Sequence, residues 1–582
     1  MAKKNKTKNL NKNSDVTESV RVAMPYQADS ETKDEGFKIS YPLLWLAFVV
    51  IAIYAPTFKF GVTELDDTIF IRDFQNYNEH LSNLLTSFNR GLFNAVKDPY
   101  YRPIFLDSMV LNYWLSGHGQ SIFSYHFINV LFHLCTVLLL YKFFLKLEID
   151  SVQSFILTLI FAVHPVLTQA VSWIPGRNDT MLAIFILIFL IKTIDYTKSG
   201  KITDILFATF FLLISFFTKE TAVFAAPAAF VLLVVVLRNK VFNQRNIIQY
   251  IAWAGCFVLW YYVRSLAIVQ AQSISGNLVS DFFHRIPLIT QYVGKIVLPI
   301  NLSVFPMQED TSNIIGIVSL LFLIATVVFS KEKNYRYIMG GAIIFMLFLL
   351  PALIVPTSLN EQTFEHRLYL PMIGALIILP QTYLFTTAKT SGQFLIFSFI
   401  VTVLLAFTNY NHQRNFADPY TFWTQAVETS PHSAFANMHL AEYEDNLDRK
   451  CSLIRKAYQL NPKEKYINFF YAEMLVNTNK KDSILSAEPY LQAEKEISGF
   501  YKCDFYLARI AVEKSDYNQA ADHLYDFLKV EPETSKEGRE ANNNLLVIFM
   551  STHQTNRLVQ QAKHMKEIGM PIAPDIVKQY NL

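Results

Sequence analysis

A series of apolar stretches, each long enough to cross the roughly 30 Å hydrocarbon core of a bilayer, dominates this chain. Two of them, 312–330 and 393–410, contain no Asp, Glu, Lys or Arg at all. Such stretches are typical of membrane spans, so the sequence predicts an all-α fold that begins with a polytopic bundle of about eleven transmembrane helices. The expected spans are 41–58, 123–145, 152–171, 178–195, 203–218, 221–238, 247–266, 312–330, 337–355, 368–387 and 393–410.

The composition supports a membrane domain joined to a soluble one. The chain is 52% hydrophobic and only 17% charged, whereas a soluble chain is usually about 25% charged. The apolar content excludes an intrinsically disordered protein, 18 Gly are too few for a collagen, and 4 Cys are too few for a disulfide scaffold. A formal net charge of +3 does not suggest a nucleic-acid binder. Because most of the charge deficit lies before about residue 410, we expect a membrane domain over 39–410 and a soluble domain over 411–582.

The basic residues indicate which way the chain runs. The lysine-rich segment 1–38 lacks apolar periodicity, so we expect a disordered cytosolic tail and not a cleaved signal peptide. Alternate connections between spans are basic, and such loops stay in the cytosol. This alternation requires the apolar segment 284–305, which Pro287 and Pro299 interrupt, to be re-entrant or interfacial. The soluble domain is then external, as in a bacterial inner-membrane protein with a periplasmic C-terminus; an endoplasmic reticulum protein would have the same topology.

The soluble domain is predicted to consist of helical repeats. Three helical segments end alike before Pro431, Pro462 and Pro532, which are 31 and 70 residues apart. These distances are close to one and two periods of a repeat of about 34 residues. We therefore expect an α-solenoid of about four tetratricopeptide-like units with atypical caps; an ordinary helical bundle is the alternative. Such an array binds extended polypeptide or a partner helix, so chemistry is expected elsewhere.

The first external connection, 59–122, is much longer than a turn needs, and long structured loops usually carry function. It begins with two adjacent carboxylates, Asp66 and Asp67, just after the first expected span. Adjacent like charges raise the pKa of one carboxyl unless a cation, metal or hydroxyl compensates. The pair therefore suggests a base that takes a proton from an incoming hydroxyl. The alternative is two solvated loop acids.

The same connection continues with Tyr101 and Arg102. Arg102 could hold a lipid phosphate while aromatic side chains line an isoprenoid groove, or it could extend to the membrane interface as an ordinary cation. His126, Asn129 and His133 follow on one face of the next helix. Packing is the simpler explanation for His133, and the histidines lack a third ligand, so no metal site is predicted.

Further ionisable residues fall at the outer ends of later spans. Charges so close to hydrocarbon cost on the order of a few kcal/mol unless they face a hydrated cavity or one another. Under the predicted topology all of them lie on the side of Asp66 and Asp67, which suggests a single external site at the membrane surface; ordinary interfacial charge is the alternative. These residues are His164, Arg177, Asp179, Lys219, Glu220, Glu365, His366 and Arg367.

Together these motifs resemble those of the C-type membrane glycosyltransferases (GT-C), most closely the transmembrane and tetratricopeptide-repeat O-mannosyltransferases and their bacterial relatives. The resemblance extends over most of 40–582, and the order of the motifs carries more weight than any one of them. It rests on Asp66-Asp67, Tyr101-Arg102-Pro103, His126 with Asn129 and His133, Phe161 to Pro165 through Gly176-Arg177, Lys219-Glu220, Glu365 to Pro371, and the terminal repeats.

The resemblance implies an inverting protein O-glycosyltransferase. Such an enzyme moves a sugar, a hexose such as mannose, from a polyprenyl-phosphate donor to Ser or Thr hydroxyls of extracytoplasmic proteins. Asp66 or Asp67, with Asp66 favoured, would deprotonate the acceptor, and no cofactor is expected because several such enzymes need no metal. Two positions depart from the family pattern: Gln169 stands where an acidic residue is common, and His366 where an Arg is usual. Donor phosphate and lipid would be bound by Tyr101, Arg102, Arg177, Lys219, His366 and Arg367, supported by His126, His164, Glu220 and Glu365.

Two other functions stay open. One is en bloc transfer of an oligosaccharide from a polyprenyl pyrophosphate, which calls for more cations or a divalent metal near Asp66 and Asp67. The other is a membrane-anchored repeat adaptor without catalytic activity. A transporter is disfavoured, because few charged residues fall near the middle of the expected spans. The expected partners are the lipid-linked sugar donor, the bilayer and acceptor polypeptides that the repeats help to bind, and no nucleic acid.

Overall fold

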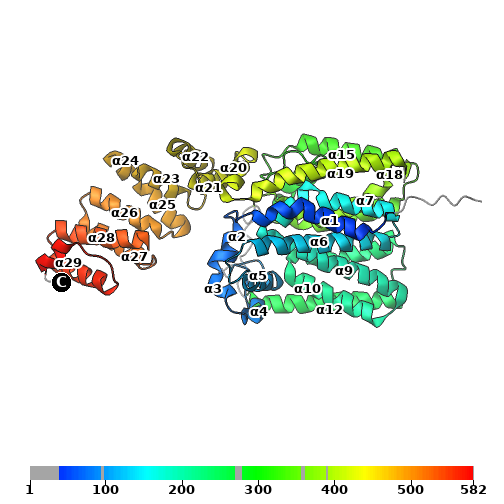
Figure 1. The fold of residues 1–582 in the computed structure, drawn as a ribbon, viewed down its shortest axis with the longest axis horizontal. Helices are drawn as coiled ribbons and strands as arrows, with labels where there is room; N and C mark the ends of the chain where they lie inside the picture. The colour runs from blue at the N-terminus through cyan, green and yellow to red at the C-terminus, as the bar shows by residue number, and fades with distance from the viewer. Residues whose placement is uncertain (1–38, 94–97, 269–277, 356–360, 388–390, 581–582) are drawn as a thin grey trace, which may run out of the picture. The chain divides into compact units, whose positions relative to one another are not determined.

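The computed structural model describes residues 39–93, 98–268, 278–355, 361–387 and 391–580 (Figure 1). The expected cytosolic tail, 1–38, lies outside these residues. Residues 39–582 form one compact unit. All regular elements of the described part are helices, as the predicted all-α class requires.

Helices cover each of the expected spans. Five are long and apolar enough to cross a membrane by length and composition: Pro42–Lys59 (α1 with η1), Phe123–Lys146 (α6), Ile174–Ser199 (η5 with α9), Tyr335–Ile354 (α16) and Gly392–Phe416 (α19 with η10). A sixth is α7 (Ser151–Val163) with Pro165–Ser172, if this pair, bent by 52°, is one span. The other expected spans contain α12 (Gln244–Ala267) and the shorter apolar helices α10 (Ile202–Thr218), Glu220–Val236 with α11 (Ala225–Val231) at its centre, α15 (Asn313–Val328) and α17 (Pro371–Ile378).

Two prolines shape the end of the bundle that carries the site. Pro165 cannot donate a backbone hydrogen bond, so α7 ends at Val163 and the chain turns through His164 into α8 (Thr168–Ser172). Pro175 and Gly176 then form a second turn before α9 (Arg177–Ser199). This is why the predicted span 152–171 is two helices in the structure.

The connection 59–122 is a folded cap. It contains α2 (Asp66–Thr68), η2 (Ile69–Asp73), α3 (Gln75–Asn78), α4 (Asn83–Thr86), η3 (Ser87–Asn89) and α5 (Pro103–Leu115). Buried side chains of the cap, Phe70 and Phe105 among them, form an apolar core with Tyr125 of α6 and Ile174. The cap is therefore fixed to the ends of the membrane helices.

The predicted re-entrant or interfacial segment 284–305 overlaps α13 (Leu278–Arg285) and contains α14 (Pro287–Val297). With 11 residues, α14 is shorter than the roughly 20 that a span needs. It packs on α15 so closely that a Cβ atom on Gly316 would lie 2.1 Å from the Thr290 carbonyl oxygen. Its connection to α15, around 302–307, reaches the first helix of the soluble domain.

The C-terminal part of the chain, which the sequence predicts to be the soluble domain, is a succession of short helices (Figure 1). Helices end shortly before each of the three prolines, at Thr429, Leu460 and Leu528. Ala508 and Ala511 of α26 are buried against Ala520 and Ala521 of α27, where small side chains let the two helices approach. The helices are α20 (Pro419–Thr429), α21 (Ala434–Glu442), α22 (Leu447–Leu460), α23 (Ile467–Val476), α24 (Lys481–Ser486), α25 (Glu488–Ser498), α26 (Lys502–Glu513), α27 (Tyr517–Leu528), α28 (Lys536–Ser551), α29 (Thr555–Glu567) and α30 (Pro574–Tyr580).

Candidate active site

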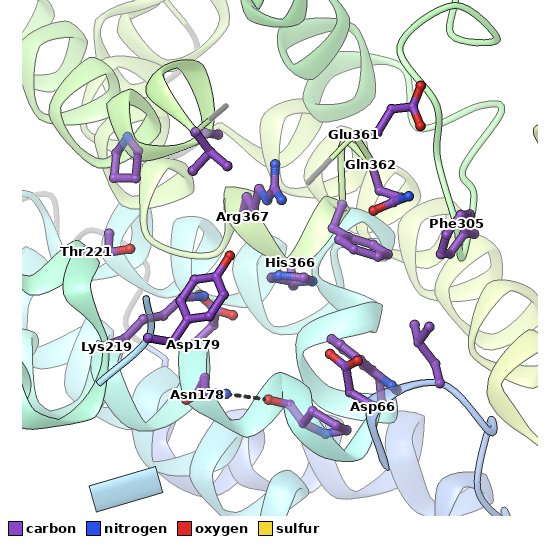
Figure 2. Close-up of a pocket in the computed structure, with 18 of the residues that line it drawn as sticks. Asp66, Asn178, Asp179, Lys219, Thr221, Phe305, Glu361, Gln362, His366 and Arg367 are labelled. Atoms are coloured by element: carbon purple, nitrogen blue, oxygen red, sulfur yellow. Dashed lines mark hydrogen bonds and ion pairs between the residues drawn. The ribbon is translucent and has the colours of Figure 1, made fainter. Parts of the chain in front are cut away.

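A cavity of about 1160 Å³ lies where the cap, the ends of the membrane helices and the first soluble helices meet (Figure 2). Its polar wall comes from the cap and from the turns that precede α9, follow α10 and precede α17. Its apolar wall includes Phe224, Phe348, Pro351 and Val355. The predicted site residues that line it are Asp66, Arg102, Lys219, Glu220, His366 and Arg367.

The two adjacent carboxylates have different surroundings. Asp67 is 1% exposed, and its oxygens accept hydrogen bonds from the Thr63 N–H, the Thr63 hydroxyl and the Leu65 N–H. Asp66 lines the cavity, and within the described part of the chain its carboxylate has no hydrogen-bond or ion-pair partner. Burial and then the charge of Asp67 raise the pKa of the Asp66 carboxyl, Arg102 opposes both effects, and the resulting pKa is about 6. Asp66 is therefore free to exchange a proton with a ligand, whereas Asp67 holds the turn.

The turn that presents Asp66 is strained. Glu64 has a positive φ of 57°, which is uncommon for a residue with a side chain. Its carboxylate accepts a hydrogen bond of 2.8 Å from the Thr68 hydroxyl, which closes the turn around Asp66. Backbone strain of this kind concentrates at functional sites.

Three cations face the same cavity. Arg102 donates to Glu220 over 2.9 Å, and Lys219 lies 2.7 Å from Asp179. Arg367 has no carboxylate within ion-pair distance among the described residues, and its Nη1 atom is buried without a hydrogen-bond partner. Burial lowers the pKa of Lys219, and although Asp179 opposes this effect, the charges of Arg102 and Arg367 add to it. Among the described residues, Arg367 is thus the one of these three cations that forms no ion pair with a carboxylate.

His366 lies near the middle of the pocket in Figure 2, with Asp66 on one side of it and Lys219 with Asp179 on the other. Burial and the nearby charges of Lys219, Arg367 and Arg102 hold its pKa well below the usual value, so the ring is neutral. Its ring stacks near Trp173 and Phe364, with centroids 5.6 and 5.3 Å away.

Gln169 and His366, the two departures from the family pattern, contact one another. The Gln169 Oε1 atom lies 3.1 Å from both the backbone nitrogen and the Nδ1 atom of His366. The Gln169 Nε2 atom donates to the Val304 carbonyl over 3.0 Å. The pair therefore joins the turn before α17 to the loop that follows α14.

Arg177 does not reach the cavity. It is fully buried and donates to the side-chain oxygens of Asn129 and Asn112 over 2.9 and 2.8 Å. Asn129 in turn donates to the Trp173 and Ile174 carbonyls, at 3.1 Å each. This network fixes the turn that leads to Asp179.

The other predicted residues that do not line the cavity also have protein partners. His133 pairs with the Tyr369 hydroxyl over 2.6 Å, as expected for a packing residue. The remaining contacts are Tyr101 hydroxyl to Phe88 carbonyl (2.9 Å), His126 Nε2 to Gly61 carbonyl (3.0 Å), His164 Nε2 to Ile296 carbonyl (2.9 Å), and Glu365 Oε1 to Lys295 Nζ (2.7 Å).

Several cavity residues were given no role in the predicted site. Asp179 follows Arg177 closely, but nothing in the sequence indicates that it meets Lys219, 40 residues away. The soluble domain also contributes a wall, which includes Phe435 and Glu464. Phe435 stacks on Phe305 at 5.4 Å, and such a contact between distant segments has no local sequence signal. No group of three or more His, Cys, Asp or Glu that could hold a metal occurs among the described residues.

No protein-family model matches the sequence. The chain is 22% identical over 466 residues to human Protein O-mannosyl-transferase TMTC3, covering 71% of this chain and 50% of that protein. It is 25% identical over 305 residues to Protein O-mannosyl-transferase F38B6.6 of Caenorhabditis elegans, covering 50% of this chain and 43% of that one. It is 34% identical over 137 residues to mouse Protein O-mannosyl-transferase TMTC1, covering 23% of this chain and 14% of that protein.

The chain thus spans about half the length, or less, of the curated relatives it matches. These relatives confirm the predicted resemblance to the transmembrane and tetratricopeptide-repeat O-mannosyltransferases.

Proposed function

We propose that this relative of the protein O-mannosyl-transferases is itself a protein O-glycosyltransferase. It transfers a hexose such as mannose from a polyprenyl-phosphate donor to Ser or Thr hydroxyls of extracytoplasmic proteins, with inversion. The observation that carries this proposal is the unpartnered carboxylate of Asp66 in one cavity with Arg102, Lys219 and Arg367. The names of the relatives support the same activity.

The proposed reaction needs a base on one side of the sugar and positive charge on the other. Asp66 takes the proton of the acceptor hydroxyl, the hydroxyl oxygen forms a bond to C1, and the bond from C1 to the phosphate oxygen breaks. The electron pair leaves with the polyprenyl phosphate, whose added charge Arg102, Lys219 and Arg367 stabilise. Attack from the face opposite the leaving phosphate inverts C1.

The charge balance favours a monophosphate donor over a pyrophosphate. Glu220 and Asp179 already pair with two of the three cations, so among the described residues Arg367 is the one of the three that is left to pair with the ligand. A sugar–phosphate diester carries one negative charge, whereas a pyrophosphate diester carries two. The apolar wall formed by Phe224, Phe348 and their neighbours would take the first isoprene units of the carrier.

Several residues that the sequence assigned to the site are buried. In this proposal they do not touch the substrates but fix the turns and segments that surround the cavity. Asp67 fixes the turn around Asp66, and Arg177 fixes the turn before Asp179. Tyr101, through its backbone N–H, and Arg102 both donate to Glu220. His126, His164 and Glu365 anchor neighbouring segments in the same way.

The proposed architecture is a GT-C-like membrane domain over 39–410 and a tetratricopeptide-like α-solenoid over 411–582. The shorter apolar helices and α12 would complete a bundle of about eleven spans alongside the five or six that qualify by length and composition. We propose a bacterial inner-membrane protein whose cavity and solenoid both face the periplasm. The solenoid would bind acceptor polypeptides, since Phe435 and Glu464 belong to a wall of the cavity.

Separate substitutions of the two acids test the proposal. Asp66→Asn removes the base and should lower kcat roughly 100-fold or more without changing the unfolding temperature. Asp67→Asn should lower both activity and stability, since its carboxylate accepts three hydrogen bonds of the turn. The measurements are transfer from a polyprenyl-phosphate sugar to peptides, and thermal unfolding in detergent. Full activity of Asp66→Asn would contradict the assignment of the base.

A cellular experiment separates this enzyme from the adaptor. Glycopeptides would be compared between source cells with and without the protein, then after rescue with Asp66→Asn. An enzyme loses specific glycopeptides that the variant does not restore. An adaptor leaves the glycopeptides unchanged, and the variant restores its cellular role.

A further inference from the structure

Two backbone groups determine which way the Gln169 amide is oriented. The backbone N–H of His366 can only donate, so the Gln169 atom 3.1 Å away must be the amide oxygen. The Val304 carbonyl can only accept, so the atom 3.0 Å from it must be the amide nitrogen. Both contacts agree on one orientation of the amide.

This orientation selects the tautomer of His366. The Nδ1 atom of His366 lies 3.1 Å from the same Gln169 oxygen, which has no proton to donate. Nδ1 must therefore carry the proton. In a neutral ring Nε2 then has a free lone pair, and the surrounding cations Lys219, Arg367 and Arg102 oppose a second proton.

The Nε2 atom is available to a ligand. His366 lines the cavity, and no described residue is a hydrogen-bond partner of Nε2. This atom is also not among the buried polar atoms that lack a partner, so it is accessible from the cavity. His366 thus presents a neutral hydrogen-bond acceptor beside a cluster of cations.

We propose that His366 is a specificity-determining residue whose Nε2 accepts a hydrogen bond from a hydroxyl of the transferred sugar, and that Gln169 positions it. The inference rests on the proposed function. The donor phosphate has no proton to give, and the acceptor hydroxyl gives its own to Asp66. The sugar, in contrast, keeps several hydroxyl protons that it can donate. Trp173 and Phe364 line the cavity beside His366, and their rings suit the C–H groups of a sugar.

Deoxy and deoxyfluoro donors test this assignment. Fluorine can replace a hydroxyl as an acceptor but not as a donor, so at one ring position both analogues should react roughly three- to ten-fold more slowly, by kcat/KM, than the parent polyprenyl-phosphate sugar. At positions where the hydroxyl only accepts, the fluoro analogue should perform better than the deoxy analogue. If no position disfavours both analogues alike, the inference is wrong.

Two substitutions at one position form a matched pair. His366→Gln keeps an acceptor and should keep the discrimination between the parent and both analogues. His366→Arg has only donors, so it should favour the fluoro analogue over the deoxy one at the same position. If both variants discriminate identically among the parent, deoxy and deoxyfluoro donors, the proposed role of His366 is wrong.

A spectroscopic measurement covers the case in which variants fold poorly or transfer is absent. Nitrogen-15 NMR of histidine-labelled protein in detergent should show His366 with a protonated Nδ1 and an unprotonated Nε2. Gln169→Leu should convert this signature into a mixture of tautomers. An Nε2–H tautomer in the parent protein would overturn the inference. Complete lack of transfer with the expected tautomer would refute the proposed function, and with it the sugar as the ligand of Nε2, but not the positioning of His366 by Gln169.

Discussion

Burial and the neighbouring charge of Asp67 both raise the pKa of the Asp66 carboxyl, which reaches about 6 although Arg102 opposes the shift. A base works only when deprotonated. We therefore expect kcat/KM to rise with pH through about 6 and to level off above it. The measurement is a pH profile of sugar transfer between about pH 4.5 and 8.

Asp67→Asn provides the control for this profile. It removes the negative charge that raises the pKa of Asp66, so the acidic limb should move to lower pH even if the maximal rate falls. An unchanged limb in this variant would mean that another group controls the profile. A profile that falls with rising pH near 6 would exclude Asp66 as the base.

At this scale the sequence identified candidate residues but not the partners that distinguish them. Asp66 was favoured over Asp67 only by resemblance, because both are equally spaced acids until their hydrogen bonds are known. Arg177 and Lys219 had the same sequence signal, a cation at the outer end of a span. Arg177 is buried by hydrogen bonds to Asn112 and Asn129, which are 65 and 48 residues away in the sequence. Lys219 instead pairs in the cavity with Asp179, which is 40 residues away.

At the scale of elements, the turn between α8 and α9 depends on Gly176. A Cβ atom there would lie 2.6 Å from the Gln169 carbonyl oxygen and 2.9 Å from the Ala170 Cα, and backbone cannot move aside as a flexible side chain can. We expect Gly176→Ala to lower activity and the unfolding temperature together, because the turn carries Trp173 and leads to Asp179. Thermal unfolding and transfer assays would measure both effects.

Gly255 provides the control position for Gly176→Ala. It lies within α12, and a Cβ atom there would meet nothing within 4 Å. Gly255→Ala should be neutral or stabilising by about 0.5–1 kcal/mol, because alanine has the higher helix propensity. If Gly176→Ala behaved like Gly255→Ala, the close approach of this turn to α8 would not matter for the site.

The helices themselves were predictable because long apolar runs require them. All expected spans contain helix, and α6 begins and ends within one residue of the predicted 123–145. The break at Pro165 also had a local cause, although the run 152–171 was interpreted as one span. The cap was predictable only as a long connection, since its short helices depend on contacts such as Phe105 with Phe70, 4.9 Å apart.

At the scale of the whole molecule, the soluble domain and the site share one loop. Gln425 of α20 accepts a hydrogen bond from the Val304 N–H and donates to the Leu302 carbonyl, both at 2.9 Å. The Val304 carbonyl in turn accepts from Gln169, the partner of His366. Gln425, Val304 and Gln169 therefore connect the first soluble helix, α20, to His366 in the cavity.

Gln425→Leu tests this connection. It leaves the Val304 N–H without its partner, which costs about 1–3 kcal/mol when that group is buried, and it frees the loop beside Gln169. We expect reduced transfer although Gln425 does not line the cavity. Gln459→Leu, at an exposed position of α22, should leave transfer unchanged. Equal activity of both variants would mean that the domains work independently.

The shared cavity also constrains the membrane topology. Asp66 in the cap and Glu464 in the soluble domain line one cavity, so both segments must lie on the same face of the membrane. The basic connection at Lys331 and Lys333 should lie on the opposite face. Compartment reporters inserted near His118, near Lys331 and after Leu582 would test this arrangement, with the first and third expected outside and the second in the cytosol.

Each result of the reporter experiment has a definite meaning. If the reporters near His118 and after Leu582 are both cytosolic, the orientation is inverted and a periplasmic acceptor is excluded. If these two lie in different compartments, Asp66 and Glu464 cannot share a cavity, and the proposed path of the acceptor from the solenoid to the base fails. If the reporter near Lys331 is external and the one after Leu582 is cytosolic, the segment 284–305 crosses the membrane and the count of about eleven spans is wrong.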